Sequence, residues 1–461
     1  MSEDSIEAIV ARARSAQAAY ETDGSQERYA RAAQAVAWAI MEPARNRELA
    51  ELAVATTGLG NVPDKITKNH RKTLGLMRDI QNAKTHGVIS DDPATGITEI
   101  ARPKGVVGAI VPSTNPAATP ANNIINALIC GNAIVVAPSP KGVACSERLL
   151  DFIHAEFAKI GEDPNLVQMI PAPGSKEKTQ SLMELCDMIV ATGSQNNVHR
   201  AQTAGTPAVA VGAGNVTVIV DETADLPAAA EKIRASKCFD NATSCSSENA
   251  VVVVDAVYDA FVEAMAGAGG ALVSDEAGIV EKLWPGGHLN RSVIAQDADK
   301  MIAALDLDVP DGTEYIAVPT SGIGPEHPLS GEKLSRVLAL YRAADFDAAV
   351  KVTREIQVYQ GAGHSVGLHS TDADRPATLA NAIPTSRVIV NQAHTFATGG
   401  SFTNGMPFSL SMGCGTWGGN SVNDNVNYRH FLQSTKIIRE IPGVEPELED
   451  IFAQYWAEAG A

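Results

Sequence analysis

The feature that most constrains the fold is a series of short apolar runs that alternate with helix-like segments between residues 106 and 221. Five to seven apolar residues, bounded by glycine, proline or a helical pattern, are typical of strands buried on both faces of a parallel sheet. The sequence therefore predicts an α/β fold with a doubly wound sheet. The expected strands are VVGAIVP (106–112), NAIVVAP (132–138), LVQMIPA (166–172), DMIVATG (187–193), PAVAVGAG (207–214) and NVTVIVD (215–221), with helices at about 120–130 and 146–160.

A second α/β unit is predicted further along the chain, from AVVVVDAVYDAFVEAM, SVGLHS and SRVIVNQ. A chain of 461 residues is too long for one simple core, so separate domains are expected. We predict a dinucleotide-binding domain from 1–86 and 105–222, in which residues 1 to about 85 are helical. Its first helix would be amphipathic and capped by Ser or Asp. A catalytic domain would follow at 223–425.

The remaining segments, 87–104 and 426–461, predict an arm and a C-terminal tail. GVISDDPATGITEIARP has two short alternating runs around a turn, which is typical of a β-hairpin. An isolated hairpin is marginal in water, so this one is expected to dock onto something. Residues 412–425 are rich in Gly and Asn and predict a loop, and the tail from Pro442 is acidic and partly helical in pattern.

Charge and cysteine usage exclude several classes of function. The formal net charge of -18 disfavours nucleic acid and anionic membranes as partners. No apolar run approaches a membrane span, and the start of the chain has acids where a signal peptide has basic residues, so a cytoplasmic protein is expected. The six cysteines show no paired spacing, which predicts free thiols and no metal site.

Cys245 is the strongest candidate for a reactive side chain. It lies just before an apolar strand, in a small polar loop with Asn241, Thr243, Ser244, Ser246 and Ser247. These residues are poor core neighbours but good donors around a thiolate. The rival is Cys238, which sits at a predicted helix end where core packing explains it, and a buried structural thiol is the plain alternative for both.

Asn115 is the second candidate, in VPSTNPAATPANN. The strand before it ends at Pro112, so Asn115 lies at the carboxyl end of a strand, where open α/β sheets bind their ligands. Because Pro116 follows, the backbone of Asn115 is biased to an extended conformation. Its amide is then free to point into a cleft, although a plain turn asparagine would read the same way.

Six motifs carry a resemblance to a known family, and they occur in that family's order. They are VPSTNP, ATGS, VGAGN, the FDN…C loop ending at Cys245, EKLS (332–335) and LSMGCGTWGGNS. From about 100 to 435 the chain resembles the aldehyde dehydrogenase superfamily, in particular its CoA-acylating branch. The resemblance implies two α/β domains with the active site between them, and a hairpin and C-terminal segment that pair across a subunit interface in a homodimer or homotetramer.

The same resemblance implies the chemistry. Cys245 would add to an aldehyde carbonyl, and Asn115 with the backbone N–H of Cys245 would form the oxyanion hole. A nicotinamide cofactor, NADP or NAD, would take the hydride and leave a thioester. The residues implied at its site are Pro112, Ser113, Thr114, Ser139, Lys141, Gly193, Ser194, Gly212 and Glu332, the last holding the nicotinamide ribose.

One departure from the family bears on the choice of cofactor. After the second strand many relatives have Lys-Pro-Ser-Glu, in which the glutamate opposes a 2′-phosphate. This chain reads Ala137, Pro138, Ser139, Pro140 and Lys141. The opposing acid is replaced and a lysine is adjacent, so either cofactor is expected to bind, with a slight preference for NADP.

An absence predicts the fate of the acyl group. Hydrolytic relatives carry a glutamate, just before two glycines, that activates water against the thioester. Ala210 occupies the matching place in PAVAVGAGNV. A general base is typically worth about 10²–10⁴-fold, so water attacks slowly without one, whereas a thiol needs less help. Coenzyme A is therefore the expected acyl acceptor.

The substrate is expected to be a small aldehyde with an anionic group. The run from NQAHTFATGG to NVNYRH resembles the sulfoacetaldehyde enzymes of the acylating branch most. A sulfonate needs hydrogen-bond donors, and the candidates are Arg387, His394, Thr398 and Ser401, with Thr395 and Asn404 nearby. Arg387 has a structural alternative as a partner for the sheet end. Succinic semialdehyde and then acetaldehyde are the rival substrates.

Three other functions remain open at this stage. A hydrolytic aldehyde dehydrogenase is disfavoured by Ala210, and a non-catalytic relative is disfavoured by the presence of Cys245. A cysteine hydrolase would need a histidine base within reach of Cys245. The ten histidines show no motif that suggests one.

Overall fold

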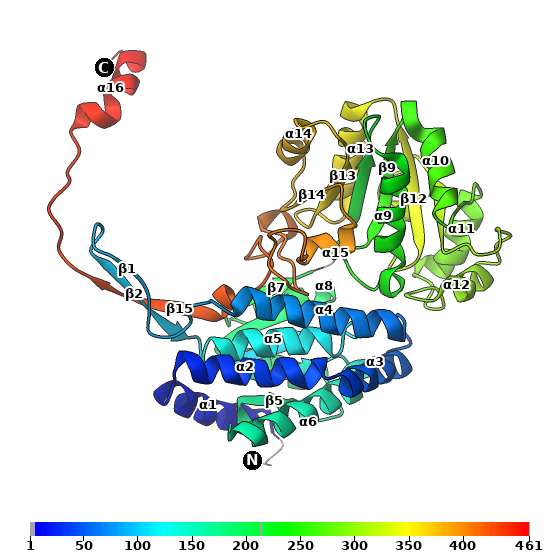
Figure 1. Ribbon diagram of the computed structural model, residues 1–461. Helices are drawn as coiled ribbons and strands as arrows, with labels where there is room; N and C mark the ends of the chain where they lie inside the picture. Colours follow the sequence, from blue (N-terminus) through cyan, green and yellow to red (C-terminus); the bar gives the residue numbers. More distant parts are fainter. Residues whose placement is uncertain (1–4, 213, 461) are drawn as a thin grey trace.

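The computed structural model describes residues 5–212 and 214–460, and it confirms the predicted α/β fold. Helix α1 begins at Ile6 because the Ser5 side chain accepts a hydrogen bond from the backbone N–H of Ala8. Asp4, the other predicted cap, lies outside the described residues. Figure 1 shows two α/β bodies, one blue to cyan and one green to orange, and an arm that projects from the first.

The first body is built on a five-stranded parallel sheet of order β5-β4-β3-β6-β7. Its strands are β3 (Val106–Val111), β4 (Ala133–Pro138), β5 (Val167–Met169), β6 (Met188–Thr192) and β7 (Ala208–Val211). Its helices are α1 (Ile6–Thr22), α2 (Gln26–Met41), α3 (Pro43–Thr57), α4 (Val62–Ile80), α5 (Ala118–Ile129), α6 (Val143–Ile160), α7 (Lys176–Leu185) and α8 (Gln195–Thr203). β3 and β4 are buried along their whole length, as the apolar runs predict.

The second body holds a seven-stranded parallel sheet of order β10-β11-β12-β9-β8-β13-β14. Its strands are β8 (Val216–Val220), β9 (Glu248–Val254), β10 (Gly270–Leu272), β11 (Tyr315–Pro319), β12 (Val337–Ala343), β13 (Val366–His369) and β14 (Val388–Val390). Its helices are α9 (Leu226–Cys238), α10 (Tyr258–Gly267), α11 (Glu276–Leu283), α12 (Ala298–Ala304), α13 (Phe346–Tyr359), α14 (Arg375–Ala382) and α15 (His394–Thr398).

The boundary predicted after residue 222 falls too late in the chain. β8 pairs with β9 and β13 in the second sheet, so the passage between the two sheets lies between Val211 and Val216. The apolar run of β8 has the same pattern as the strands before it. That pattern reports burial on both faces and cannot say which sheet the strand joins.

The predicted hairpin is present as β1 (Val88–Asp92) and β2 (Ile97–Pro103), which pair antiparallel. β15 (Leu432–Ile438) from the C-terminal segment pairs antiparallel with the other edge of β2. An extended segment then leads to α16 (Leu448–Ala459), which buries none of its residues and lies far from both bodies (Figure 1). Within the described part of the chain, no helix has the length and apolar character needed to cross a membrane.

Short 3-10 turns connect many of these elements. They are η1 (Pro140–Gly142), η2 (Pro164–Leu166), η3 (Phe239–Ala242), η4 (Asp255–Val257), η5 (Pro285–Gly287), η6 (Pro328–Ser330), η7 (Thr416–Gly418) and η8 (Tyr428–Phe431). The turn η3 matters most for function, because it leads from α9 into the loop that carries Cys245.

Candidate active site

The loop that presents Cys245 is held by an unusual turn. Asp240, Asn241 and Ala242 all have left-handed backbones, with φ of 47°, 55° and 59°. Such conformations cost energy for residues other than glycine and persist only where the surroundings enforce them. Buried Asp240 supplies part of that enforcement through ion pairs with Lys65 at 3.1 Å and Lys68 at 2.5 Å.

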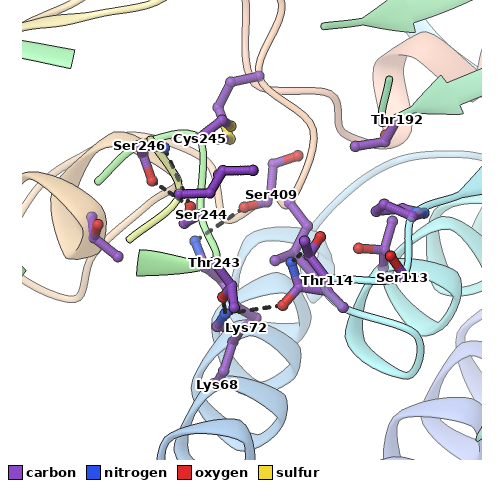
Figure 2. Close-up of a pocket in the computed structure, with 18 of the residues that line it drawn as sticks. Lys68, Lys72, Ser113, Thr114, Thr192, Thr243, Ser244, Cys245, Ser246 and Ser409 are labelled. Carbon is purple, nitrogen blue, oxygen red and sulfur yellow. Dashed lines mark hydrogen bonds between the residues drawn. The ribbon is translucent and has the colours of Figure 1, made fainter. Parts of the chain in front are cut away.

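Cys245 lines a pocket between the two bodies, and it is the half-buried cysteine of the six; the other five are buried, as core packing predicts. Burial, with the Glu332 carboxylate as the next cause, raises the pKa of the Cys245 thiol to about 12. Figure 2 shows Cys245 on one side of the pocket, with Lys68 and Lys72 rising toward it from α4 and with Ser113 and Thr114 opposite.

Asn115 lines the same pocket, and its orientation is set by Lys68. The Lys68 ammonium donates to Asn115 Oδ1 at 2.9 Å, and also to Asp240 and to Thr243 Oγ1. With Oδ1 held by a cation, the Asn115 NH₂ group has, among the described residues, only a long contact of 3.5 Å to Thr114 Oγ1. Its N–H bonds are therefore available to an oxygen in the pocket, as an oxyanion hole requires.

A histidine lies within reach of the sulfur, which the sequence motifs did not reveal. His364 Nε2 is 3.3 Å from Cys245 Sγ, although the two residues are 119 positions apart. The distance that a cysteine–histidine pair requires, for which the sequence shows no motif, is thus met. Burial, and next the charge of Arg387, lowers the pKa of His364 to about 3, so its imidazole is neutral.

A short hydrogen-bond chain behind His364 favours one of its tautomers. His364 Nδ1 and His394 Nε2 each lie 2.8 Å from the Ser365 hydroxyl, and buried His394 Nδ1 has no hydrogen-bond partner among the described residues. A buried N–H without an acceptor is rarer than an acceptor without a donor. His394 then donates from Nε2 to Ser365, Ser365 donates to His364, and His364 Nε2 carries the proton that faces Cys245.

The carboxyl ends of β3, β6 and β7 form the wall predicted to hold the cofactor. Pro112, Ser113, Thr114, Gly193, Ser194, Gly212 and Glu332 line the pocket. Gly193 has a φ of 147°, a backbone that side chains with a Cβ rarely adopt. Ala213, in the VGAGN motif, lies outside the described residues.

Ser139 and Lys141 do not line this pocket. They follow β4, whose carboxyl end lies beside that of β3, so they extend the same edge of the sheet. The Ser139 hydroxyl is buried and has no partner among the described residues, and Lys141 is exposed. An unpartnered donor and an exposed cation suit the adenosine end of a dinucleotide that continues from the pocket.

Glu332 lies in the loop between η6 and β12, not on a surface helix. Burial is the main cause that raises its pKa to about 7, against the opposing charges of Lys237 and Lys333. Glu332 is the one carboxyl residue among the described residues that line the pocket. It changes charge near neutral pH, which marks it as a functional candidate.

Ala210 is buried in β7 and does not reach the pocket wall, whereas Gly212, two residues later, does. An alanine and a glycine offer no group that could activate water. The described wall therefore lacks a carboxylate on the β7 side, where the hydrolytic relatives were expected to carry their glutamate.

The structure does not bring Arg387, His394, Thr398 or Ser401 to the pocket, where the sequence analysis expected substrate contacts. The Arg387 guanidinium is buried and donates to the carbonyls of His364 and Gly413 and to Asn425 Oδ1. These bonds hold loops together at the sheet end, so Arg387 has a structural role there. Thr398 and Ser401 bond within their own turn, and of the neighbouring candidates Thr395 lines the pocket.

The sequence motifs also did not identify three cations of α4 as pocket residues. Lys68, Arg71 and Lys72 have the spacing i, i+3, i+4, which places them on one helix face, and all three line the pocket. That spacing is visible in the sequence. It carries no sign of a pocket, however, because charged residues at such positions are ordinary on an exposed helix.

Comparisons with known proteins find similar proteins over nearly the whole chain. The model of the aldehyde dehydrogenase family matches residues 1–277. The chain is 54% identical to a sulfoacetaldehyde dehydrogenase (acylating) of Cupriavidus necator, covering 99% of this chain and 93% of that protein. An acetylating aldehyde dehydrogenase from Geobacillus thermoglucosidasius superposes with a TM-score of 0.91 at 29% identity, covering 96% of this chain and 98% of that one. A propionaldehyde dehydrogenase from Rhodopseudomonas palustris, solved with CoA and an acylated cysteine, gives 0.83 at 26% identity, covering 95% and 97%.

Proposed function

The chain belongs to the aldehyde dehydrogenase family, and from that premise we propose that it oxidises a small anionic aldehyde to its acyl-CoA with a nicotinamide cofactor. The observation that carries the proposal is that one pocket holds both the Cys245 thiol, as a nucleophile, and the Asn115 NH₂ group, as a hydrogen-bond donor. The acylating relatives, and the CoA bound beside an acylated cysteine in the neighbouring structure, support coenzyme A as the acceptor.

The first step is addition of the Cys245 sulfur to the aldehyde carbon, which forms a C–S bond and moves the carbonyl electrons onto oxygen. The Asn115 NH₂ group and the backbone N–H of Cys245 donate hydrogen bonds to that oxygen and stabilise it. Lys68 orients the Asn115 amide for this role by donating to its Oδ1. Because the sulfur reacts as a thiolate, the thiol proton must leave. Glu332, with its pKa near 7, is the carboxylate in the pocket suited to accept it.

The second step converts the hemithioacetal to a thioester. A nicotinamide, when bound, supplies the hydride acceptor, and the residues Pro112–Thr114, Gly193–Ser194 and Gly212 would hold it along the wall of the first body. Coenzyme A, after its thiol has lost a proton to solvent, attacks the thioester carbon as a thiolate; the acyl group moves to the sulfur of coenzyme A and the Cys245 thiolate leaves. The N–H of His364, 3.3 Å away, stabilises that leaving sulfur.

The arm supports an oligomer. β1 and β15 are the two edges of the three-stranded sheet, and β15 is exposed along nearly its whole length. Exposed edges pair readily with another chain. A homodimer or homotetramer assembled through this arm is part of the proposal.

A steady-state assay tests the proposal. Purified protein receives sulfoacetaldehyde, succinic semialdehyde or acetaldehyde with NADP or NAD, and reduced cofactor is followed by absorbance while acyl-CoA is identified by mass spectrometry. CoA-dependent reduction with an acyl-CoA product, fastest with an anionic aldehyde, is expected. Equal reduction without CoA would indicate a hydrolytic enzyme, and thioester hydrolysis without any cofactor reduction would indicate a cysteine hydrolase built on Cys245 and His364.

The pKa of Glu332 predicts how activity depends on pH. Burial raises this pKa to about 7, so the carboxylate is neutral below that pH and ionised above it. Both roles assigned to Glu332, accepting the thiol proton and holding the ribose, need the ionised form. We expect kcat/KM for the cofactor to rise about tenfold from pH 6 to pH 8, the change in ionised fraction across a pKa of 7. In Glu332→Gln this rise should disappear. If the variant keeps the rise, Glu332 has neither of these two roles.

Lys141 predicts the cofactor preference. It is exposed at the sheet edge beyond the pocket, where a 2′-phosphate would lie. Lys141→Glu places a repelling charge there, and we expect it to raise the KM for NADP by about tenfold, a typical cost of a like-charge contact at a partly exposed site, while the KM for NAD stays within about twofold. Lys159→Glu, an exposed lysine on α6, is the control. Equal changes for both cofactors in Lys141→Glu would contradict this placement.

A further inference from the structure

The three cations on the pocket-facing side of α4 are not equivalent. Lys68 forms an ion pair with the buried carboxylate of Asp240, which it shares with Lys65, and it holds Asn115. Arg71 and Lys72 have no ion pair with a carboxylate among the described residues. A cation that is buried without an anionic partner is costly, and proteins retain such groups mainly where they act.

Lys72 is held in place by neutral groups only. Its ammonium donates to the carbonyl oxygens of Gly399 at 2.5 Å and Ser409 at 3.0 Å. An ammonium has three N–H bonds, so one remains for a ligand. Burial, and next the charges of Arg71 and Lys68, lower the pKa of Lys72 well below its ordinary value, and the charge of Cys245 acts in the opposite direction. An anion in the pocket would do the same, so ligand binding favours the protonated form.

Arg71 is fixed along one edge of its guanidinium. Nη2 donates to the carbonyls of Phe396 at 2.9 Å and Gly400 at 3.1 Å, and the group lies over the rings of Phe396 and Phe408. Neither Nε nor Nη1 has a hydrogen-bond partner among the described residues. A guanidinium that is already oriented, with donors left over, is well suited to bind a group with several terminal oxygens.

Two buried hydroxyls point to a ligand at this site as well. Thr395 is 6% exposed and Thr119 is 1% exposed, and both line the pocket. The Oγ1 atom of each has no hydrogen-bond partner among the described residues. Buried polar atoms are normally satisfied, so their partner is expected to come from what fills the pocket.

We infer that Arg71 and Lys72, with the Thr395 hydroxyl, form the subsite that binds the anionic end of the aldehyde, a sulfonate or a carboxylate. The inference rests on the proposed function, and it assigns substrate selection to α4 rather than to Arg387 and its neighbours. Figure 2 shows Lys72 rising from α4 toward the pocket, below the loop that carries Cys245. An aldehyde anchored there by its charged end presents its other end, the carbonyl, to the sulfur.

Substrate discrimination in Arg71→Gln tests the subsite. kcat/KM is measured with CoA and cofactor for sulfoacetaldehyde, succinic semialdehyde and the neutral propanal. Loss of a charge-assisted contact that is made only to the anionic substrates should lower their kcat/KM by about 100-fold and leave propanal within about threefold. Arg78→Gln is the matched control, because Arg78 also lies on α4 over Phe408 but is exposed and does not line the pocket.

Two variants of Lys72 distinguish a role in anion binding from a role in supporting the loop. Lys72→Arg should retain most of the preference for anionic substrates over propanal, and Lys72→Met should lose it. If Arg71→Gln and Lys72→Met lower all three aldehydes alike, these residues only support the loop and the inference is wrong. No change in either variant would also overturn it.

A binding measurement keeps the test independent of turnover. Ethanesulfonate should protect Cys245 from iodoacetamide in the unchanged protein and in Arg78→Gln, but not in Arg71→Gln. An unchanged protein with no CoA-dependent turnover of any aldehyde would contradict the proposed function, while protection lost in Arg71→Gln would still support the anion subsite. Failure of ethanesulfonate to protect the unchanged protein, despite normal turnover, would contradict the subsite alone.

Discussion

Cys245→Ala is expected to lower kcat for aldehyde oxidation by at least about 10⁴-fold, the usual consequence of removing a covalent nucleophile. Without the sulfur no hemithioacetal forms, and the hydride has no activated carbon to leave from. The measurement is cofactor reduction with saturating aldehyde and CoA. Cofactor binding should persist, because the wall formed after β3, β6 and β7 is untouched.

The matched control is Cys238→Ala, at the end of α9. Cys238 is buried and does not line the pocket, which suits a structural side chain. Activity of this variant should stay within about threefold, since removing one buried sulfur leaves a small cavity outside the pocket. The reverse pattern, with Cys238 essential and Cys245 dispensable, would show that Cys238 is the nucleophile and that the assignment to Cys245 is wrong.

Asn115→Ala is expected to lower kcat by about 10²–10³-fold, the typical effect of losing one oxyanion-hole donor. The Asn115 amide meets the oxygen only as charge develops on it, so the KM for the cofactor should change little. Asn196→Ala, on the exposed side of α8, serves as the control. A kcat for Asn115→Ala within threefold of the unchanged protein would show that other donors stabilise the oxygen.

The parts of the site that could be predicted from sequence are those made by contiguous residues. Pro112–Asn115 and Gly193–Ser194 follow apolar strands directly, and the carboxyl ends of parallel strands meet at one edge, so their convergence follows from the pattern. Cys245 was identifiable from its polar loop and its family motif. The hairpin and the helical N-terminal segment follow in the same way from local periodicity.

Other contributions depend on distant segments and left no local signal. His364 reaches Cys245 across 119 residues, and Lys68 reaches Asn115 across 47, through packing of α4 against the loop. Arg387 shows the opposite case. Its place near the expected substrate segment suggested a ligand contact, yet its donors are used by backbone carbonyls and Asn425. A sequence pattern does not predict which groups the charged end of a long side chain contacts.

The central claim is that the acyl group waits on Cys245 until coenzyme A arrives. It is tested most directly by mixing the protein with excess sulfoacetaldehyde and cofactor but no CoA. We predict a burst of one reduced cofactor per active site followed by a stall, an acyl adduct on Cys245 in the intact-protein mass, and release of that adduct when CoA is added. Steady cofactor reduction without CoA, with no adduct accumulating, would contradict the account.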